Sequence, residues 1–479
     1  MHLQGTFYIL KKRCKVTLTV DGISWVPEAS PECYHHIRVA EVLGCWLCPR
    51  CSHSCCHYAH PTAPDTTTSP TPLTVAHCKH SLRGTSGAGL TLEYCERGRK
   101  LEWRPRAVAL VHAAGDVVVA WYQAIWALLH GLPQRPKRVL VIINPEGGKR
   151  CAHNVYAKKV APLFRRAALH ATVVQTQYRG HGRELVENGT GMDLVDGVVA
   201  VGGDGLVNEL VMGLLMVSIR RAGVDPHDPQ VTLPTTHLRL GIIPGGSTDA
   251  MCHGTHGTSD VITAALHIIM GDSRCVDVAA IYRNGQFQNV ATTMVSYGYF
   301  GDLLKTSEQW RKLGPTRYLV SGFLQFMRNR SYEGQLKVLT PANPLAQPYD
   351  MNGCCHECSV CDKAAMAAPA AGQWLKFTGR WSVVTSAVMS CACRLSPYGV
   401  SPSAHLGDGC TDLILVSGGS RCRILSYLFR TAYTGNAVSL DHVNIHRVQE
   451  VHFTPKPTGA KSQWNCDGEQ LTEPALKLK

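Results

Sequence analysis

The segment from 196 to 215, DGVVAVGGDGLVNELVMGLL, constrains the fold more than any other part of the chain. Residues 198–201 predict a buried strand, and leucines at positions 206, 210 and 214 predict a helix after it. Between them lies the turn Gly202-Gly203-Asp204-Gly205. A strand that enters a helix through glycines exposes backbone N–H groups at the helix N-terminus, where phosphate binds. The carboxylate of Asp204 inside this turn indicates chemistry on a phosphate, through proton acceptance or metal positioning.

The bulk composition predicts a globular protein with room for two to four domains in its 479 residues. The formal net charge of +13 favours anionic partners such as nucleotide, acidic lipid surfaces or nucleic acid, and equally serves solubility. Residues 1–15 lack the apolar core of a signal peptide, and the apolar run 117–132 is shorter than the ~18–20 residues that span a bilayer. We therefore expect a soluble or peripheral protein whose 21 cysteines are reduced.

The first of three regions, 1–132, shows β-type alternation in residues 14–26 and a helical pattern in 116–132. A segment rich in Cys, His, Thr and Pro, 45–72, separates these patterns and is interpreted as an insertion. Residues 131–137, GLPQRPK, are a candidate linker.

The second region, 138–277, alternates predicted strands with predicted helices. The strands are 139–143, 171–177, 198–201 and 238–243, and the helices are 154–169, interrupted near Pro162, and 206–217. This alternation predicts a parallel sheet with helices on both faces, which binds ligands at the carboxyl ends of its strands. In the third region, 278–479, short strands dominate with few helices, such as 302–311, and predict an antiparallel β domain.

Two further glycine-rich turns follow strands of the second region. The first is Asn144-Pro145-Glu146-Gly147-Gly148-Lys149, which lacks the spacing of a P-loop, and the second is residues 244–249, PGGSTD. Each alone is typical of a tight turn as much as of a phosphate site. Three such turns in one α/β domain, one of them carrying Asp204, together indicate a phosphate-binding site.

NPEGGK, GGDG, PGGS and a late DGE, at 467–469, occur in this order. With them the chain resembles the diacylglycerol kinase and sphingosine kinase catalytic family of ATP-dependent lipid kinases, most closely its ceramide kinase branch. The strings KKVAPLF, LRLGIIPGGSTD, MSCACRLSPYGVSPSAHLGDG and SQWNCDGE support this resemblance, which covers about residues 138–478. The implied fold is α/β: an N-terminal pleckstrin-homology-like β domain (1–132), then a two-domain lipid-kinase core. That core comprises an α/β parallel-sheet nucleotide domain (138–277) and an antiparallel β-sandwich domain (278–479).

The resemblance also implies residue roles. Asp204 is the expected general base, within a lipid-binding turn of Gly202, Gly203, Asp204 and Gly205. The expected ATP site consists of Asn144, Pro145, Glu146, Thr176, Gln177, Tyr178, Arg179, Gly180, Glu209, Gly246, Ser247, Thr248, Asp467, Gly468 and Glu469. Arg311 and Arg317 match arginines that bind nucleotide phosphates in sphingosine kinases, although a solvated surface charge is an equal interpretation. Asp467 and Glu469 are expected to organise Mg²⁺ or the nucleotide.

Three departures from the family pattern are informative. Sphingosine kinases carry a second carboxylate two residues beyond the one matching Asp302, where it meets the substrate ammonium, and this chain has Leu304 there. Ceramide has no ammonium, so Leu304 favours a neutral amide lipid. In the first turn, Arg150 replaces the usual glycine and Glu146 adds a negative charge. These two residues either weaken nucleotide binding or face solvent.

Cys354, Cys358 and Cys361 form a C-x3-C-x2-C pattern that ceramide kinases share. Zn²⁺ with a fourth ligand from His356, Cys391 or Cys393 is one interpretation, and reduced thiols needed for packing are a slightly favoured one. The N-terminal CWLCPRCSHSCC also has zinc-like spacing, but its Thr/Pro-rich continuation favours a disordered insertion.

Other partners follow from the N-terminal resemblance and from one basic helix. The segment 97–106, RGRKLEWRPR, is predicted as a basic strand that binds phosphoinositide headgroups at a membrane surface. The helical segment 421–430, RCRILSYLFR, is compatible with calmodulin or membrane contact, and more commonly is a half-buried helix. The resemblance leaves Ca²⁺ open as a regulator, implies no nucleic-acid partner, and implies a cytoplasmic protein at Golgi and plasma membranes.

The expected activity is transfer of phosphate from MgATP to ceramide, giving ceramide 1-phosphate. The alternatives are a related kinase of diacylglycerol or sphingosine, a soluble NAD kinase, which also uses a GGDG turn, and a weakly active lipid-binding adaptor.

Overall fold

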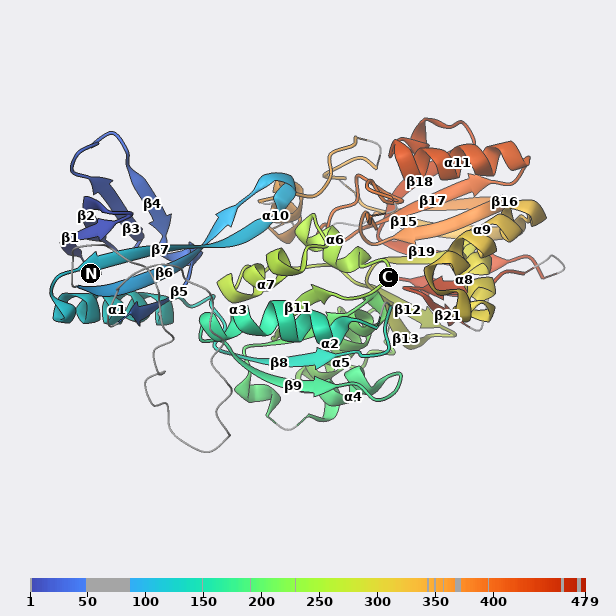
Figure 1. Cartoon of the computed structure of the whole chain (residues 1–479). Coiled ribbons are helices and arrows are strands. Elements are labelled where there is room, and N and C mark those ends of the chain that lie inside the picture. Colours follow the sequence, from blue (N-terminus) through green and yellow to red (C-terminus); the bar gives the residue numbers. More distant parts are fainter. Residues whose placement is uncertain are drawn as a thin grey trace. The chain divides into compact units, whose positions relative to one another are not determined.

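The structure, a computed structural model, describes residues 2–48 and 87–479 apart from short gaps (Figure 1). Those gaps are 149, 190, 229, 343, 349, 356, 367–371, 395, 458–460 and 472–474, and the side chains of 311, 312 and 315 are also not described. The described residues divide into two compact units. The first comprises residues 1–138, 158–171 and 265–272, and the second comprises 139–157, 172–264 and 273–479.

An antiparallel sheet and one helix form most of the first unit. The seven strands lie in the order β4-β3-β2-β1-β7-β6-β5. They are β1 (Leu3–Ile9), β2 (Lys12–Leu18), β3 (Gly22–Pro27), β4 (His35–Arg38), β5 (Val42–Cys48), β6 (Ala88–Arg97) and β7 (Trp103–His112). Helix α1 (Gly115–His130) buries Val118, Trp121, Ile125 and Leu129, which share one helical face. Trp121 meets Phe7 edge-on at a centroid distance of 4.9 Å, so the predicted alternation and helix close one core.

Two predictions for this unit need correction. Residues 97–106 do not form one strand: β6 ends at Arg97, the chain turns through Gly98 and a short 3₁₀ segment (Arg99–Leu101), and β7 begins at Trp103. Lys100 and Leu101 adopt φ of 56° and 60°, which ends the strand and makes a hairpin tip. The predicted insertion begins later than residue 45, because 45–48 belong to β5. The remainder, 49–72, lies outside the described residues.

A parallel sheet forms the first half of the second unit, as predicted. Its order is β11-β10-β8-β9, with β10 parallel to both neighbours. The strands are β8 (Arg138–Ile143), β9 (His170–Gln175), β10 (Gly197–Gly202) and β11 (Arg239–Pro244), of which β8 and β9 begin at the unit boundary. All six residues of β10 are buried, which explains its unbroken apolar run.

The helices of this α/β region are more numerous than the two that were predicted. They are α2 (Ala152–Val155), α3 (Ala161–Arg166), α4 (His181–Asn188), α5 (Asp204–Ala222), α6 (Ala250–His256) and α7 (Val261–Met270). The interruption predicted near Pro162 in the helix 154–169 is present as a π-helical segment, Tyr156–Val160, which ends two residues before Pro162. Proline has no N–H for the regular ladder, which accounts for the interruption.

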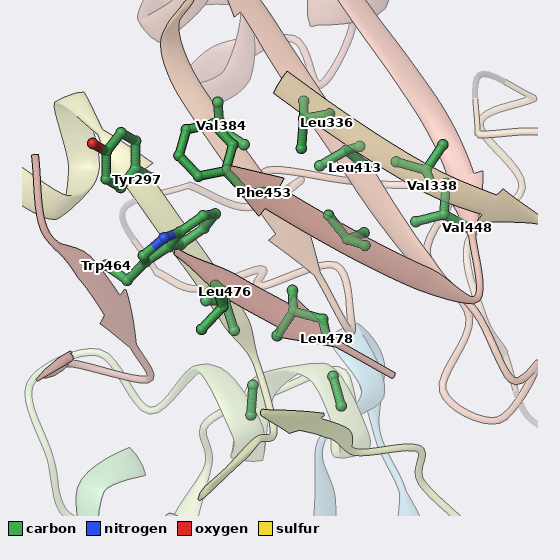
Figure 2. Close-up of a cluster of buried hydrophobic side chains, with 14 of the residues drawn as sticks. Tyr297, Leu336, Val338, Val384, Leu413, Val448, Phe453, Trp464, Leu476 and Leu478 are labelled. Carbon is green, nitrogen blue, oxygen red and sulfur yellow. The ribbon is translucent and has the colours of Figure 1, made fainter. Parts of the chain in front are cut away.

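An eleven-stranded sheet with antiparallel pairing forms the rest of the described second unit. Its strands are β12 (Ala279–Arg283), β13 (Gln286–Ala291), β14 (Met294–Gly298), β15 (Tyr332–Thr340), β16 (Gln373–Ala387), β17 (Thr411–Ser417), β18 (Val443–Val448), β19 (Glu450–Pro455), β20 (Trp464–Cys466), β21 (Glu469–Leu471) and β22 (Leu476–Leu478). Figure 2 shows its core, where Tyr297, Phe453 and Trp464 pack among aliphatic side chains such as Leu336 and Val384. This core holds the C-terminal strands β20 and β22 against strands about 170–200 positions earlier in the chain.

Four helices accompany this sheet: α8 (Tyr299–Gln309), α9 (Arg317–Arg328), α10 (Ser359–Met366) and α11 (Arg421–Tyr433). α8 starts three residues before its predicted beginning. α11 buries Ile424 and Tyr427 and exposes Leu425, Phe429 and Tyr433, so both its apolar and its basic residues reach the surface. No helix of the described residues has the length and apolar character needed to cross a bilayer.

Candidate functional site

The three glycine-rich turns meet at one edge of the parallel sheet. Val201 lies opposite Ile143 and Gly202 lies opposite Pro244, so β8, β10 and β11 end side by side. Their backbones are in contact: a Cβ built on Gly246 would lie 2.5 Å from the Cα of Gly203, and one on Gly148 would lie 2.7 Å from the carbonyl carbon of Gly246. Glycine is therefore required where the backbones of the turns are in contact. The three turns together form one continuous surface made of backbone atoms.

The first turn is fixed by Asn144. Its backbone N–H donates to the Val201 carbonyl at 3.1 Å, and its side-chain oxygen accepts from the Glu146 N–H at 3.0 Å. Pro145 lies between them, and Glu146 pairs with Arg150 at 3.3 Å with both side chains about three-quarters exposed. Of the two interpretations of this pair, the structure matches the solvent-facing one. Arg150 has φ of 56°, a left-handed conformation that explains glycine as the usual residue there.

Asp204 is the first residue of α5 and lies where the three turns meet. One carboxylate oxygen accepts from the N–H of Ala250 at 3.1 Å, and the other accepts from the N–H of Met251 at 2.9 Å. These donors are the first N–H groups of α6, which otherwise lack partners within that helix. Burial raises the pKa of Asp204 to about 6, although the two N–H groups lower it, and the nearby carboxylates of Asp249 and Asp467 raise it further.

The segment after β9 closes the sheet edge beside β8. Thr176 is buried and donates from its backbone to the Ile143 carbonyl at 2.9 Å. The Gln177 N–H donates to His181, and the exposed Tyr178 donates its hydroxyl to Glu184 at 2.7 Å. Glu209, on α5, accepts from the N–H groups of Gly180 and Gly182 at 2.9 and 3.1 Å. The Glu209 carboxylate thus holds this segment against α5 and caps α4.

The late DGE forms a two-residue hairpin turn between β20 and β21, with φ of 48° at Asp467 and 93° at Gly468. Each carboxylate oxygen of Asp467 accepts three hydrogen bonds. The six donors are the N–H groups of Thr292, Thr293 and Met294, the hydroxyls of Thr292 and Thr293, and the amide of Asn208. These contacts bind the hairpin to the β13–β14 corner and to α5. Asp467 therefore links the eleven-stranded sheet to helix α5 of the α/β region.

Glu469 and Arg179 connect the hairpin to the loop after β9. Arg179 pairs with Glu469 at 2.7 Å, and Glu469, together with Glu308 on α8, raises the pKa of Arg179. Arg317 pairs with Glu308 at 3.5 Å and donates to the Tyr318 hydroxyl at 2.7 Å. Arg317 is thus linked electrostatically to this edge of the site. Arg311 lies in a 3₁₀ segment (Arg311–Thr316), and its side chain is outside the described ones.

A second carboxylate, Asp302, lies on α8. It accepts from the Ser462 hydroxyl at 2.7 Å and from the buried Tyr332 hydroxyl. Leu304 is half-buried on the same helix. Ser247 and Thr248 are exposed in the third turn, and Asp249 fixes that turn by accepting from the Gly246 N–H at 2.8 Å.

Sequence reasoning did not assign Asp249, Asn208 or the pair Thr292-Thr293. Asp249 carried a local signal, because it ends the quoted PGGSTD turn. Asn208 lies among the mostly apolar buried residues of α5, which is also a readable signal. The threonine pair carried none, since its partner Asp467 lies more than 170 positions away in sequence.

The predicted cysteine cluster exists with a different fourth member. Cys354, Cys358 and Cys361 gather with His405. Cys391 instead donates its thiol to the Thr293 carbonyl at 3.4 Å, and Cys393 pairs through its backbone with Ser396. The expectation that Cys391 or Cys393 completes the set is therefore wrong, because the chain bends them toward other partners. His356, also considered, lies outside the described residues.

Comparison with known proteins matches two family models. The model described as "Diacylglycerol kinase catalytic domain" covers residues 138–281, and that described as "Ceramide kinase C-terminal domain" covers 352–475. The chain is 35% identical to ceramide kinase of Homo sapiens over 431 residues, 81% of this chain and 80% of that protein. It is 30% identical to ceramide kinase 1 of Caenorhabditis elegans over 402 residues, 81% of this chain and 72% of that protein.

More distant matches have lower identity. Ceramide kinase-like protein of Homo sapiens is 27% identical over 426 residues, 80% of this chain and 74% of that protein. A crystal structure of a diacylglycerol kinase from Bacillus anthracis superposes with a TM-score of 0.45 at 17% identity, over 71% of this chain and 93% of that chain.

Proposed function

The chain belongs to the ceramide kinase family, and from this premise we propose that it transfers the γ-phosphate of MgATP to the primary hydroxyl of ceramide, with Asp204 as general base. The observation that carries the proposal is the position of Asp204: a carboxylate with a raised pKa where three glycine turns meet. A base at that point lies beside the glycine-rich turns, where we propose that the polyphosphate of ATP binds. The product is ceramide 1-phosphate.

The residues at the sheet edge fit MgATP. Gly148, Gly203 and Gly246 carry no side chains where the turns meet, so a phosphate can approach the backbone of the turns closely. The exposed Ser247 and Thr248 add hydroxyl donors at the same edge. Glu469 is the better of the two DGE carboxylates for Mg²⁺, because Asp467 already accepts six hydrogen bonds. When bound, Mg²⁺ supplies neutralisation of the phosphate charge.

Within this site, the chain's own groups position the reactants and move one proton. The N–H groups of Ala250 and Met251 fix the Asp204 carboxylate in place. Asp204 accepts the proton of the lipid hydroxyl while the oxygen of that hydroxyl attacks the phosphoryl group. In this proposal Arg179, which pairs with Glu469, neutralises charge on the phosphates.

Gly246→Ala tests the contact between the second and third glycine-rich turns. The new Cβ would be 2.5 Å from the Gly203 Cα, so one turn must move. We expect a loss of about 1–3 kcal/mol in the free energy of unfolding, and a raised KM for MgATP. Gly205→Ala is the matched control for stability, since its Cβ meets nothing within 4 Å and alanine favours the helix by up to about 1 kcal/mol. Equal stability of both variants in urea denaturation would contradict the close contact between the backbones of Gly246 and Gly203.

Leu304→Asp tests the substrate assignment. A carboxylate there offers a partner to the ammonium of sphingosine and an unpaired charge to ceramide. A hydrogen bond between charged groups contributes about 1.5–3 kcal/mol, so the ratio of kcat/KM for sphingosine over ceramide should rise about ten- to hundredfold. Leu304→Asn, equal in size and uncharged, is the control. If both variants change the ratio alike, position 304 does not face the lipid headgroup.

The experiment that tests the function itself is transfer of labelled γ-phosphate from MgATP to ceramide, sphingosine and diacylglycerol in mixed micelles. Labelling of ceramide alone is the expected result. Labelling of another lipid would replace the substrate and retain the kinase. No labelling of any lipid by folded protein would favour the lipid-binding adaptor.

For the first unit, we propose a pleckstrin-homology domain that binds phosphoinositide headgroups. The support is its seven antiparallel strands followed by one helix. At the β6–β7 tip, Arg104 and Arg106 pair with Glu102 and Glu96, while Arg99 and Lys100 are exposed for a headgroup. Co-sedimentation of the full chain with vesicles that contain phosphoinositide, compared with phosphatidylcholine vesicles, tests this proposal. Equal binding to both would count against it.

A further inference from the structure

Three thiols and one imidazole converge beside the loop that follows β16. The ligand atoms of Cys354, Cys358, Cys361 and His405 all lie within 4.8 Å of one another. The sulfurs of Cys354 and Cys361 are 3.6 Å apart, and the Cys358 sulfur is 3.2 Å from the His405 Nδ1. Among the described residues, this is the group of His, Cys, Asp or Glu side chains with the geometry of a metal site.

These distances suit one tetrahedral ion. Sulfurs bound to Zn²⁺ at about 2.3 Å and at tetrahedral angles lie about 3.8 Å from each other, close to the separation found. A disulfide would need sulfurs about 2.05 Å apart, and these cysteines are free. A [4Fe–4S] cluster places each thiolate on a different iron, which separates the sulfurs further than one shared ion does.

The surroundings also favour a metal over unpartnered thiols. Cys358, Cys361 and His405 are each less than 8% exposed, so the donors are shielded from water. The Nε2 of His405 is buried without a hydrogen-bond partner among the described residues, so Nδ1 is the atom that holds the ring.

We propose that Cys354, Cys358, Cys361 and His405 bind one structural Zn²⁺. Four protein ligands leave no open position for water, which is typical of structural zinc sites. The ion would tie the start of α10 to the loop that carries His405. Cys354, Ala404 and Leu406 also line a cavity of about 270 Å³ that reaches Gly254 on α6, the helix whose first N–H groups hold Asp204. The proposal does not rest on the identity of the lipid.

Metal content of the full-length protein tests the site directly. After purification and dialysis in metal-free buffer, we expect about one Zn²⁺ per chain by inductively coupled plasma mass spectrometry. Cys358→Ser and His405→Gln should each lose most of it. His405→Cys should retain zinc, because four thiolates also form a structural zinc site. Cys355→Ser is the matched control, since Cys355 belongs to the same segment but is exposed and outside the cluster.

A second measurement keeps the test valid if the ligand variants fail to fold. Wild-type protein is titrated with a mercurial thiol reagent while a colorimetric chelator reports released Zn²⁺. We expect Zn²⁺ to be released as the slowest-reacting cysteines are modified, because thiolates bound to the metal should react last. The proposal is overturned if wild-type protein holds no zinc and takes up neither Zn²⁺ nor Co²⁺. It is also overturned if the metal is iron, or if His405→Gln and Cys358→Ser retain full zinc.

Discussion

Asp204→Asn should lower kcat for lipid phosphorylation about a thousandfold, within the range for loss of a general base. The asparagine side chain has nearly the same size and still accepts one of the two α6 hydrogen bonds, but it cannot take a proton from the lipid hydroxyl. We therefore expect a folded protein that binds MgATP and turns over slowly. Steady-state kinetics at saturating MgATP in ceramide micelles give the comparison.

The pH profile adds an independent readout. Burial raises the pKa of Asp204 to about 6, so below that pH the carboxyl is protonated and cannot act as a base. The kcat/KM of the wild type should thus rise through about pH 6 and level off above pH 7. Asp204→Asn should lack this acidic limb, because its side chain does not titrate.

Two controls separate the base from other roles. Asp116→Asn, an exposed acidic residue at the start of α1, should leave kcat unchanged. The Mg²⁺ concentration for half-maximal rate should stay constant in Asp204→Asn if the residue moves a proton, and rise if it holds the metal. A variant with more than about a tenth of wild-type kcat would rule out the base assignment.

The sequence made the α/β half of the site predictable because its signals are local. A buried strand, two glycines, an acid and a helix stripe occupy 20 consecutive residues around Asp204, and the structure reproduces that order. The positions of the other two turns followed from the rule that parallel strands end at one edge. The contact of Gly203, in the turn of Asp204, with Gly246, in the third turn, could not be predicted, since it depends on the register between β10 and β11.

What the sequence could not supply comes from distant pairs. His405 joins three cysteines that precede it by 44 to 51 positions, and no spacing rule points to it. The 97–106 segment was mistaken for a strand because its alternating pattern is the same on both sides of a hairpin tip. Glu209 has the residue type of a nucleotide or metal ligand, yet its oxygens accept from Gly180 and Gly182. Residue type alone does not distinguish a capping carboxylate from a catalytic one.

Asp467→Asn should reduce the free energy of unfolding by about 3–4 kcal/mol. The carboxylate accepts six hydrogen bonds, three on each oxygen. An amide nitrogen cannot accept, so one set of donors loses its partner. If the amide oxygen faces Thr293 and Met294, the buried N–H of Thr292 meets a second donor instead. Asparagine readily adopts the left-handed conformation found here, so the loss would report the carboxylate and not the turn.

Glu469→Gln is the matched comparison for Asp467→Asn. Glu469 lies two residues away and makes a largely exposed pair with Arg179, and such pairs contribute about 0–1 kcal/mol. We expect a fall of about 10 °C in the thermal midpoint for Asp467→Asn, and little change for Glu469→Gln.

In the kinase assay the order should reverse, because Glu469 is proposed to hold Mg²⁺. Glu469→Gln should therefore need more Mg²⁺ for half-maximal rate. Asp467→Asn should need the same Mg²⁺ as wild type below its melting temperature. Equal melting of both variants would show that the six donors find other acceptors, and a raised Mg²⁺ requirement in Asp467→Asn would return that carboxylate to the metal site.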